Sequence, residues 1–307
     1  MRLVFMGTPD FAIPSLNRLL ASSHTVLGVV TQPDRPSGRG LKVQFSPVKK
    51  MALAHGLPLL QPQKLTEPEF LNTLQTWNAD CFVVVAFRIL PKEVFTMPPK
   101  GTINLHASLL PKYRGPAPIQ RAILNGEKET GVTTFFIEET VDTGQWILQE
   151  KVAIGPEETA GELHDRLAKL GAEVLLQTLD LIEKDLALPH PQVGTPTSAP
   201  KIHPEEGKID WKEPAEKVFN RIRAFSPKPG AYTFWNEKRL KILRASLVQG
   251  NSGQIPGTVL ECQKDKIIVA CGSDAVGIRE IQPESKKGMD VDAFLRGYGL
   301  KPGMLLR

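Results

Sequence analysis

The sequence predicts an α/β fold: a Rossmann-like, doubly wound and mostly parallel sheet, with a small C-terminal β-barrel of the OB-like type. Three observations support this fold class. Short apolar runs alternate with helical patterns in the first half of the chain, a proline-rich segment interrupts them, and β-rich runs follow at short, regular spacing. Alternation of this kind is typical of parallel βαβ units, whereas closely spaced strands are typical of a small barrel.

The elements of the first half follow one another in a clear order. Strands are expected at residues 3–6, 26–31, 57–60, 81–87, 102–106 and 132–138, and helices at 10–20, 118–124 and 159–185. The continuous apolar run at 81–87 is typical of a central strand covered on both faces. In the last helix, Leu163, Leu167 and Leu170 recur at three- and four-residue intervals, which predicts one buried face.

A proline-rich segment at residues 188–204 separates this half from the rest. It holds five prolines, so we expect an extended linker with few contacts to its surroundings. The predicted domains are therefore an α/β domain at 1–187 and a β-barrel domain at 205–307. Beyond the linker, a helix is expected at 214–225 and strands at 231–235, 240–247, 257–262, 266–270 and 276–281.

Composition limits the class of protein. The 307 residues are 41% hydrophobic and 23% charged, which excludes a disordered chain, a collagen and a small disulfide scaffold. The three cysteines, Cys81, Cys262 and Cys271, form no C-x-x-C pair, so neither zinc nor a disulfide framework is expected. With no apolar run of about 18 residues and too short an apolar N-terminus for a signal peptide, we expect a cytoplasmic protein without a membrane partner.

The net charge of +5 is unevenly distributed. Residues 201–307 hold 19 basic and 13 acidic side chains, whereas residues 1–200 hold 19 and 20. A basic C-terminal module favours a polyanionic partner, although a solvated basic face explains the charge equally well.

Polar residues at the end of the 102–106 strand form the most informative pattern. Asn104 and His106 lie on one face of that strand, at the carboxyl end where open α/β sheets bind their ligands. Asp142 follows the next strand, and although Asp-x-Gly is a common turn, its carboxylate is placed to meet His106. The three would supply a hydrogen-bond donor, a proton carrier and an orienting carboxylate, although a buried hydrogen-bonded core pair is the structural alternative.

Nucleotide-binding motifs are missing after the first strand. Gly7 is followed by neither G-x-G-x-x-G nor a P-loop, which disfavours a nucleotide-dependent dehydrogenase. A tight turn is the expected role of this glycine.

The motifs around these residues resemble those of the folate-dependent formyltransferases. The resemblance rests on Asn104-x-His106, Ser108-Leu-Leu-Pro111, Arg114-Gly115 and Asp142-x-Gly144. It extends along the whole chain through the stretches at 5–11, 31–40, 46–49, 116–121, 131–133, 209–211, 223–225 and Pro227. Within that family, the sequence is most similar to members that formylate methionine on initiator tRNA.

This resemblance implies an enzyme that moves the formyl group of 10-formyltetrahydrofolate to the free amino group of methionyl initiator tRNA, for translation initiation and without a metal. Asn104, His106 and Asp142 would be catalytic. The implied folate-binding residues are Phe87, Arg88, Ile89, Leu90, Ser108, Leu109, Leu110 and Pro111. Phe87-Arg88 stands where the family commonly has Tyr-Gly, so this part of the pterin pocket departs from the family pattern. The structural alternative for Arg88 is a local salt bridge.

The resemblance also implies a tRNA-binding loop at residues 33–50. The cations assigned to tRNA are Arg35, Arg39, Lys42 and Lys49. Arg39 lies between Gly38 and Gly40 and would wedge into the acceptor end, although charge alone fits an exposed, solvated loop equally well. The protein is expected to act as a monomer.

Two other functions remain open at this stage. A formyltransferase for a nucleotide-linked amino sugar or a glycinamide ribotide would share the three catalytic residues, but the Arg39 loop and the basic last third argue against it. A folate- or tRNA-binding module without turnover is disfavoured by the intact set of Asn104, His106 and Asp142.

Overall fold

The chain forms two compact units, each assembled from more than one stretch of sequence. The computed structural model describes residues 1–37, 42–250 and 253–307. The N-terminal unit takes in residues 1–115, 130–152 and 164–198, and the C-terminal unit takes in 116–129, 153–163 and 199–307. Each unit therefore draws residues from both sides of the predicted linker.

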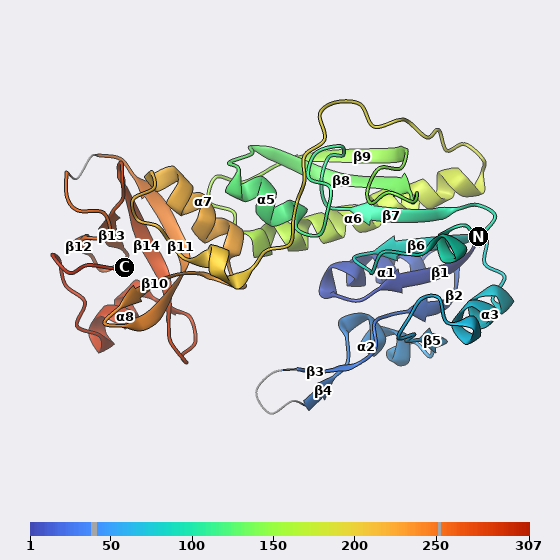
Figure 1. The fold of residues 1–307 in the computed structure, drawn as a ribbon, viewed down its shortest axis with the longest axis horizontal. Coiled ribbons are helices and arrows are strands. Elements are labelled where there is room, and N and C mark those ends of the chain that lie inside the picture. Colours follow the sequence, from blue (N-terminus) through green and yellow to red (C-terminus); the bar gives the residue numbers. More distant parts are fainter. Residues whose placement is uncertain (38–41, 251–252) are drawn as a thin grey trace. The chain divides into compact units, whose positions relative to one another are not determined.

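A seven-stranded sheet forms the centre of the N-terminal unit (Figure 1), with the strand order β5-β2-β1-β6-β7-β8-β9. The strands are β1 (Arg2–Gly7), β2 (Thr25–Val30), β5 (Leu59–Leu60), β6 (Cys81–Val85), β7 (Thr102–His106), β8 (Glu129–Phe136) and β9 (Trp146–Ala153). Pairing from β5 to β7 is parallel, and β7 pairs with β8 antiparallel. The mostly parallel, Rossmann-like sheet that the sequence predicts is confirmed.

Helices cover both faces of this sheet, as a doubly wound fold requires. The helical elements of the unit are η1 (Asp10–Ala12), α1 (Ile13–Leu20), α2 (Pro47–Ala54), α3 (Pro68–Thr76), α4 (Lys92–Phe95) and most of α6 (Ala160–Glu183). Phe70 of α3 and Val94 of α4 share a buried core cluster with Val84 of β6. On the other face, the Thr178 hydroxyl of α6 hydrogen bonds to Thr134 of β8 at 2.7 Å.

Several local predictions need correction. The strand expected at 81–87 ends at Val85, because Ala86 adopts a left-handed φ of 49° and turns the chain. The sequence analysis missed β9, which alternates weakly because much of it is exposed, and it also missed the short helices α2, α3 and α4.

The C-terminal unit contains an antiparallel sheet with the order β10-β11-β14-β13-β12, to which β15 adds beside β14. Its strands are β10 (Ala231–Trp235), β11 (Lys238–Val248), β12 (Val259–Cys262), β13 (Ile267–Ala270), β14 (Ala275–Pro283) and β15 (Met289–Asp290). Its helices are α5 (Pro118–Leu124), η2 (Pro204–Gly207), α7 (Ala215–Phe225) and α8 (Val291–Gly297). The sheet is consistent with the predicted small barrel, and β15 and α8 were not predicted.

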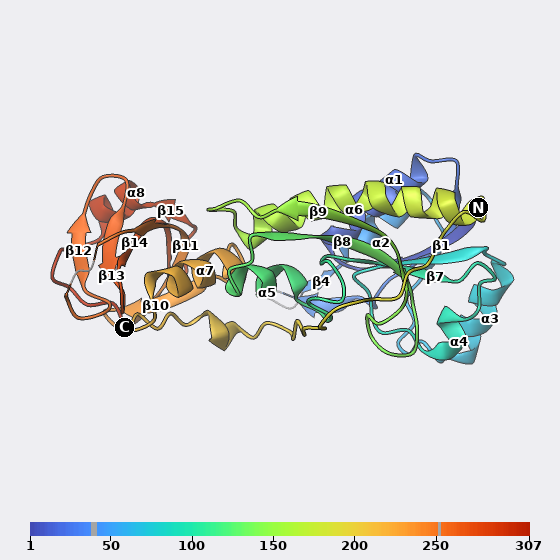
Figure 2. The ribbon, with the colours of Figure 1, turned by 90° about the horizontal axis from the view of Figure 1, so that it is seen from above.

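The proline-rich segment is extended, as predicted, but the expectation that it makes few contacts is wrong (Figure 2). His190 and Trp146 exchange two backbone hydrogen bonds at 3.0 and 2.8 Å. Further along, the carbonyl of Thr197 accepts from the backbone N–H of Arg114 at 2.9 Å. Proline removes donors from such a segment, yet the carbonyls and the non-proline N–H groups still pair with neighbouring chain.

One further finding concerns membranes. Across residues 1–37, 42–250 and 253–307, no helix combines the length and the apolar character that crossing a membrane requires.

Candidate active site

Asn104 and His106 lie at the carboxyl end of β7, on the same face of the sheet, as the sequence analysis predicts. Asn104 pairs in register with Val84 of β6. The side chains of Asn104 and His106 therefore project on the face of the sheet that carries the core cluster around Val84, which is the face opposite α6. Asn104 is partly buried and His106 is only 7% exposed. A polar pair in this position has little contact with bulk water.

The imidazole of His106 is fixed by a backbone carbonyl. Its Nε2 atom lies 2.8 Å from the carbonyl oxygen of Tyr113. Because a carbonyl oxygen only accepts hydrogen bonds, Nε2 is protonated and donates a hydrogen bond to the carbonyl of Tyr113. The second ring nitrogen, Nδ1, therefore faces the site and is the atom available for proton transfer.

Asp142 approaches that nitrogen from the turn after β8. Its Oδ2 atom lies 3.8 Å from Nδ1 of His106, and its side chain is about 10% exposed. The same oxygen accepts a hydrogen bond from the backbone N–H of Gly115 at 2.8 Å. The structure thus brings together two of the three predicted catalytic side chains, and it fixes the carboxylate independently of the histidine.

Gln192, which the sequence did not predict as a site residue, holds the Asp142 turn in place. Its amide nitrogen donates to the carbonyls of Asp142 and Gly144, at 2.9 and 2.8 Å. Its amide oxygen accepts from the guanidinium of Arg114, at 3.1 and 2.7 Å. Because Gln192 lies in the proline-rich segment and belongs to no motif, no feature of the sequence marks it.

The same turn explains a glycine of the Asp142-x-Gly144 motif. A Cβ atom at position 144 would lie 1.7 Å from the carbonyl oxygen of Phe136, a separation that no side chain tolerates. Only glycine allows the turn to pack this closely against the end of β8.

The residues at 108–111 form a fixed segment directly after β7. The Thr133 hydroxyl donates to the carbonyl of Ser108 at 2.6 Å and accepts from the N–H of Leu110 at 3.2 Å. Ser108 itself is buried and donates to the carbonyl of Lys112 at 2.6 Å. Leu110 is also buried, whereas Leu109 and Pro111 are partly exposed.

The residues at 87–90 follow β6, the neighbour of β7. Arg88 donates to the backbone carbonyls of Pro62 and Gln63, both at 2.9 Å, so its guanidinium ties this loop to the chain after β5. Ile89 is 74% exposed, Phe87 is partly buried, and Leu90 packs into the core cluster between the sheet and α3 and α4.

The predicted tRNA-binding cations lie on a hairpin and on the helix that follows it. Arg35 belongs to β3 (Arg35–Ser37) and Lys42 to β4 (Lys42–Gln44), which pair antiparallel, whereas Arg39 lies outside the described residues. Lys49, in α2, forms an ion pair with Asp34 and is only 12% exposed. Hydrogen bonds from Lys49 and Gln61 lower the pKa of Asp34, so the charge of Lys49 is already compensated within the protein.

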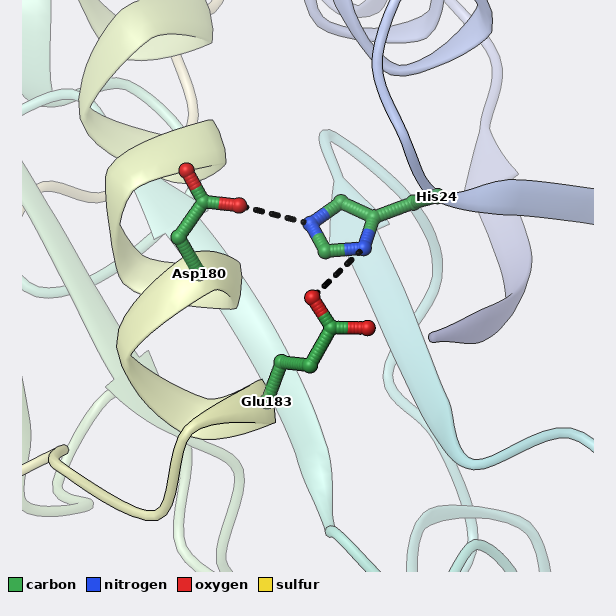
Figure 3. A group of neighbouring side chains, drawn as sticks. All are labelled: His24, Asp180 and Glu183. Atoms are coloured by element: carbon green, nitrogen blue, oxygen red, sulfur yellow. Dashed lines mark ion pairs between the residues drawn. The ribbon is translucent and has the colours of Figure 1, made fainter.

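One cluster of potential metal ligands occurs in the described part of the chain, at His24, Asp180 and Glu183 (Figure 3). The carboxylates flank opposite ring nitrogens: Asp180 lies 3.2 Å from Nε2, and Glu183 lies 3.9 Å from Nδ1. The amino group of Met1 lies 3.0 Å from Nδ1 of His24 and forms an ion pair with Glu183, so the protein's own cation already pairs with this cluster. The geometry instead suits an ion-pair network that joins the start of β2 to the end of α6.

Two family models match the chain. Residues 1–179 match the formyl transferase model, and residues 201–299 match the formyl transferase C-terminal domain model.

Curated relatives match over the whole length. The chain is 49% identical to the methionyl-tRNA formyltransferase of Caldanaerobacter subterraneus subsp. tengcongensis, with 100% of both chains covered. It is also 49% identical to that of Moorella thermoacetica, with 100% of this chain and 99% of the relative covered.

Solved structures share the fold at low sequence identity. Methionyl-tRNA formyltransferase from Clostridium thermocellum matches with a TM-score of 0.59 at 19% identity, covering 91% of this chain and 99% of that one. The sugar 3N-formyl transferase WlaRD, solved in the presence of dTDP and 5-N-formyl-THF, matches with a TM-score of 0.67 at 21% identity, covering 94% and 99%. From the two family models and the full-length relatives, the chain belongs to the formyl transferase family.

Proposed function

We propose that this enzyme transfers the formyl group of 10-formyltetrahydrofolate to the free amino group of methionine esterified to initiator tRNA, for translation initiation. The observation that carries the proposal is the buried pair of His106 and Asp142 beside Asn104, at the carboxyl edge of the sheet. Its full-length similarity to methionyl-tRNA formyltransferases supports the choice of acceptor.

The reaction begins with the amine of the acceptor. A free α-amino group has a pKa near ~8, so an appreciable fraction is unprotonated and nucleophilic at neutral pH. Its nitrogen attacks the formyl carbon, and negative charge develops on the formyl oxygen. The amide N–H of Asn104 would stabilise that oxyanion, and a fixed donor at such a position contributes strongly to catalysis.

His106 transfers the proton between the reacting groups. Because Nε2 donates to Tyr113, Nδ1 is the atom that takes the proton released by the attacking amine and passes it to the leaving nitrogen of the folate. The nearby carboxylate of Asp142 stabilises the positive charge that the ring carries between these two transfers. The new bond joins carbon to the amine nitrogen, the bond to the folate nitrogen breaks, and tetrahydrofolate leaves protonated.

The folate is assigned to the loops at 87–90 and 108–111. These loops follow the neighbouring strands β6 and β7, so both reach the carboxyl edge beside His106. Because Arg88 is held by two backbone carbonyls, it would shape the wall of the pocket there. Arg88 lacks the backbone freedom of the glycine that the family commonly has after this strand.

The tRNA is assigned to the cations Arg35, Arg39 and Lys42 of the segment at 33–50, and to the basic C-terminal unit. As a translation enzyme, the protein would act in the cytoplasm, and we propose that it does so as a monomer, which light scattering in solution tests.

A transfer assay with isotope-labelled formyl donor tests the proposed function. Label should move from 10-formyltetrahydrofolate to methionyl initiator tRNA, and not to a dTDP-linked amino sugar. Transfer to the sugar nucleotide but not to the tRNA would overturn the assignment of the acceptor and favour the sugar-modifying branch of the family.

A further inference from the structure

Phe45 is an exposed aromatic ring in the turn between β4 and α2. It is 44% exposed, which makes it the most exposed of the phenylalanine, tyrosine and tryptophan residues in the described part of the chain. Exposure of a large apolar ring costs hydrophobic free energy that burial would recover. Part of the ring surface is therefore available to a ligand.

The backbone that follows the ring is fixed. Ser46 caps α2, because its hydroxyl accepts from the N–H of Lys49 at 3.0 Å. The same hydroxyl lies 3.1 Å from the hydroxyl of Thr31, at the end of β2. Phe45 thus projects from a chain segment that is anchored both to a helix and to the central sheet.

One face of the ring is occupied by a cation. The ammonium of Lys49 lies 4.0 Å from the centroid of the Phe45 ring. Asp34 holds that ammonium in an ion pair, and Gln61 in turn donates to Asp34 at 3.1 Å. The four side chains form one chain of contacts, which presents the ring in a preset orientation.

We infer that Phe45 is a stacking platform for an unpaired nucleobase of the RNA acceptor, an inference that rests on the proposed function. An aromatic ring with a cation behind it offers a π-face to any base, and such stacking contributes substantially to binding of single-stranded nucleic acid. Lys49 neutralises Asp34, and the other charged residues in the described part of this segment, Arg35 of β3, Lys42 of β4 and Lys50 of α2, are all basic. These cations suit the phosphates that flank a stacked base.

The place of Phe45 in the fold fits an RNA end on its way to the catalytic residues. The β3–β4 hairpin follows β2 and extends away from the sheet (Figure 1). The parallel strands β2 and β7 end at the same edge of the sheet, with β1 and β6 between them. A single-stranded acceptor terminus that approaches His106 along this edge from the side of β2 would pass the ring of Phe45, which would hold one of its bases.

Kinetics with four variants test the inference. Replacement of Phe45 by Ala or Leu should raise the KM for methionyl-tRNA roughly 10-fold, because stacking is lost. The KM for 10-formyltetrahydrofolate should stay within about twofold. Phe45→Tyr, which keeps the π-face, should restore the wild-type KM. Leu53→Ala removes a comparably exposed apolar side chain from α2 and serves as the matched control.

A binding measurement gives a readout that does not depend on activity. The probe is an RNA hairpin that carries 2-aminopurine in a single-stranded 3′ end, whose emission falls when the base stacks. The wild type and Phe45→Tyr should quench it, and Phe45→Ala and Phe45→Leu should not. Matched unfolding temperatures of the variants would show that the fold is unchanged.

The possible outcomes separate the platform from the proposed function. Normal tRNA kinetics and undiminished quenching in Phe45→Ala would overturn the platform while the function stands. A raised KM for the folate alone would assign the ring to the pterin instead, and absent quenching by the wild type would also overturn the platform. Quenching by a wild type that transfers no formyl group to the tRNA would overturn the function and leave the platform standing.

Discussion

Nδ1 of His106 and Oδ2 of Asp142 face each other at 3.8 Å, a separation too long for a hydrogen bond. Each side chain has its own support: the ring nitrogen Nε2 donates to the carbonyl of Tyr113, and the carboxylate accepts from the N–H of Gly115. The pair therefore shares no proton, and the carboxylate acts on the ring through charge once Nδ1 is protonated. This arrangement leaves Nδ1 free to exchange a proton with the reacting groups.

The first prediction follows from that arrangement. Because Asp142→Asn keeps an oxygen that accepts from Gly115 but removes the charge, it should fold normally and still lower turnover about 10²-fold or more. Asn104→Ala and His106→Ala should each lower it by a similar order, with folate binding retained. Single-turnover formyl transfer and a folate titration measure both effects. A near-normal rate for His106→Ala would remove histidine from the mechanism.

The second prediction concerns Gln192 as a positioning residue. Gln192→Ala removes the hydrogen bonds to Asp142, Gly144 and Arg114, so kcat should fall roughly 10-fold while the KM for the folate changes little. The neighbouring Val193 is 82% exposed, and Val193→Ala is the matched control.

Proteolysis supplies an independent readout for the same variant. The 188–198 segment should resist limited digestion in the wild type, because its backbone is paired, and should become susceptible in Gln192→Ala. Equal digestion of the wild type and the variant, together with an unchanged kcat, would show that Gln192 does not hold the turn.

The sequence predicted those parts of the fold that depend on local pattern. Strand β7 and helix α5 have the predicted bounds because their apolar residues and the proline at the start of α5 are local signals. The same-face placement of Asn104 and His106 also follows directly from the two-residue period of a strand.

What the sequence could not supply depends on contacts between distant segments. Gln192 reaches Asp142 across 50 positions, and no periodicity encodes such a contact. Likewise, the sequence predicts Lys49 to be a free cation, whereas in the fold it forms an ion pair with Asp34. Both cases are tertiary pairings of polar side chains, which composition and spacing leave undetermined.

The third prediction compares two cations on different parts of the chain. Arg39→Ala should strongly lower transfer to methionyl-tRNA, and the loss should be smaller with a tRNA whose acceptor end is firmly paired. Lys286→Ala should cause only a small loss, of equal size on both tRNAs. Binding of tRNA should weaken steeply with salt in both variants, since the remaining cations still displace counterions. Transfer assays with the two tRNAs make the comparison. Equal losses by both variants on both tRNAs would refute a wedging role for Arg39.

The fourth prediction concerns acid stability at the start of α6. Thr159 and Glu162 form a capping box, in which the carboxylate accepts from the Thr159 N–H at 2.9 Å and hydroxyl at 2.8 Å, and Arg244 is ion-paired to the same carboxylate. Partial burial by itself raises the pKa of Glu162, but the hydrogen bonds from Arg244 and Thr159 outweigh it and lower that pKa to about 2.

The sign of the effect follows from linkage. Because the folded-state pKa lies below the ordinary value of 4.5, the unfolded chain binds more protons between about pH 4.5 and pH 2. The stabilisation from Glu162 is thus fully present above pH 4.5 and is lost as the pH falls toward 2. Since both partners are partly exposed, its size is modest, about 1 kcal/mol or less.

Glu162→Gln tests this window, because glutamine preserves the capping box without a titratable charge. At pH 7 the variant should unfold about 1–3 °C below the wild type, and the difference should shrink steadily as the pH falls below 4.5. Glu284→Gln removes an equal charge from an exposed position and should show no such convergence. Thermal unfolding followed by circular dichroism from pH 7 to pH 2.5 measures both curves. A gap between Glu162→Gln and the wild type that stays constant across this range would mean that Arg244 and Thr159 do not hold the carboxylate in its charged form.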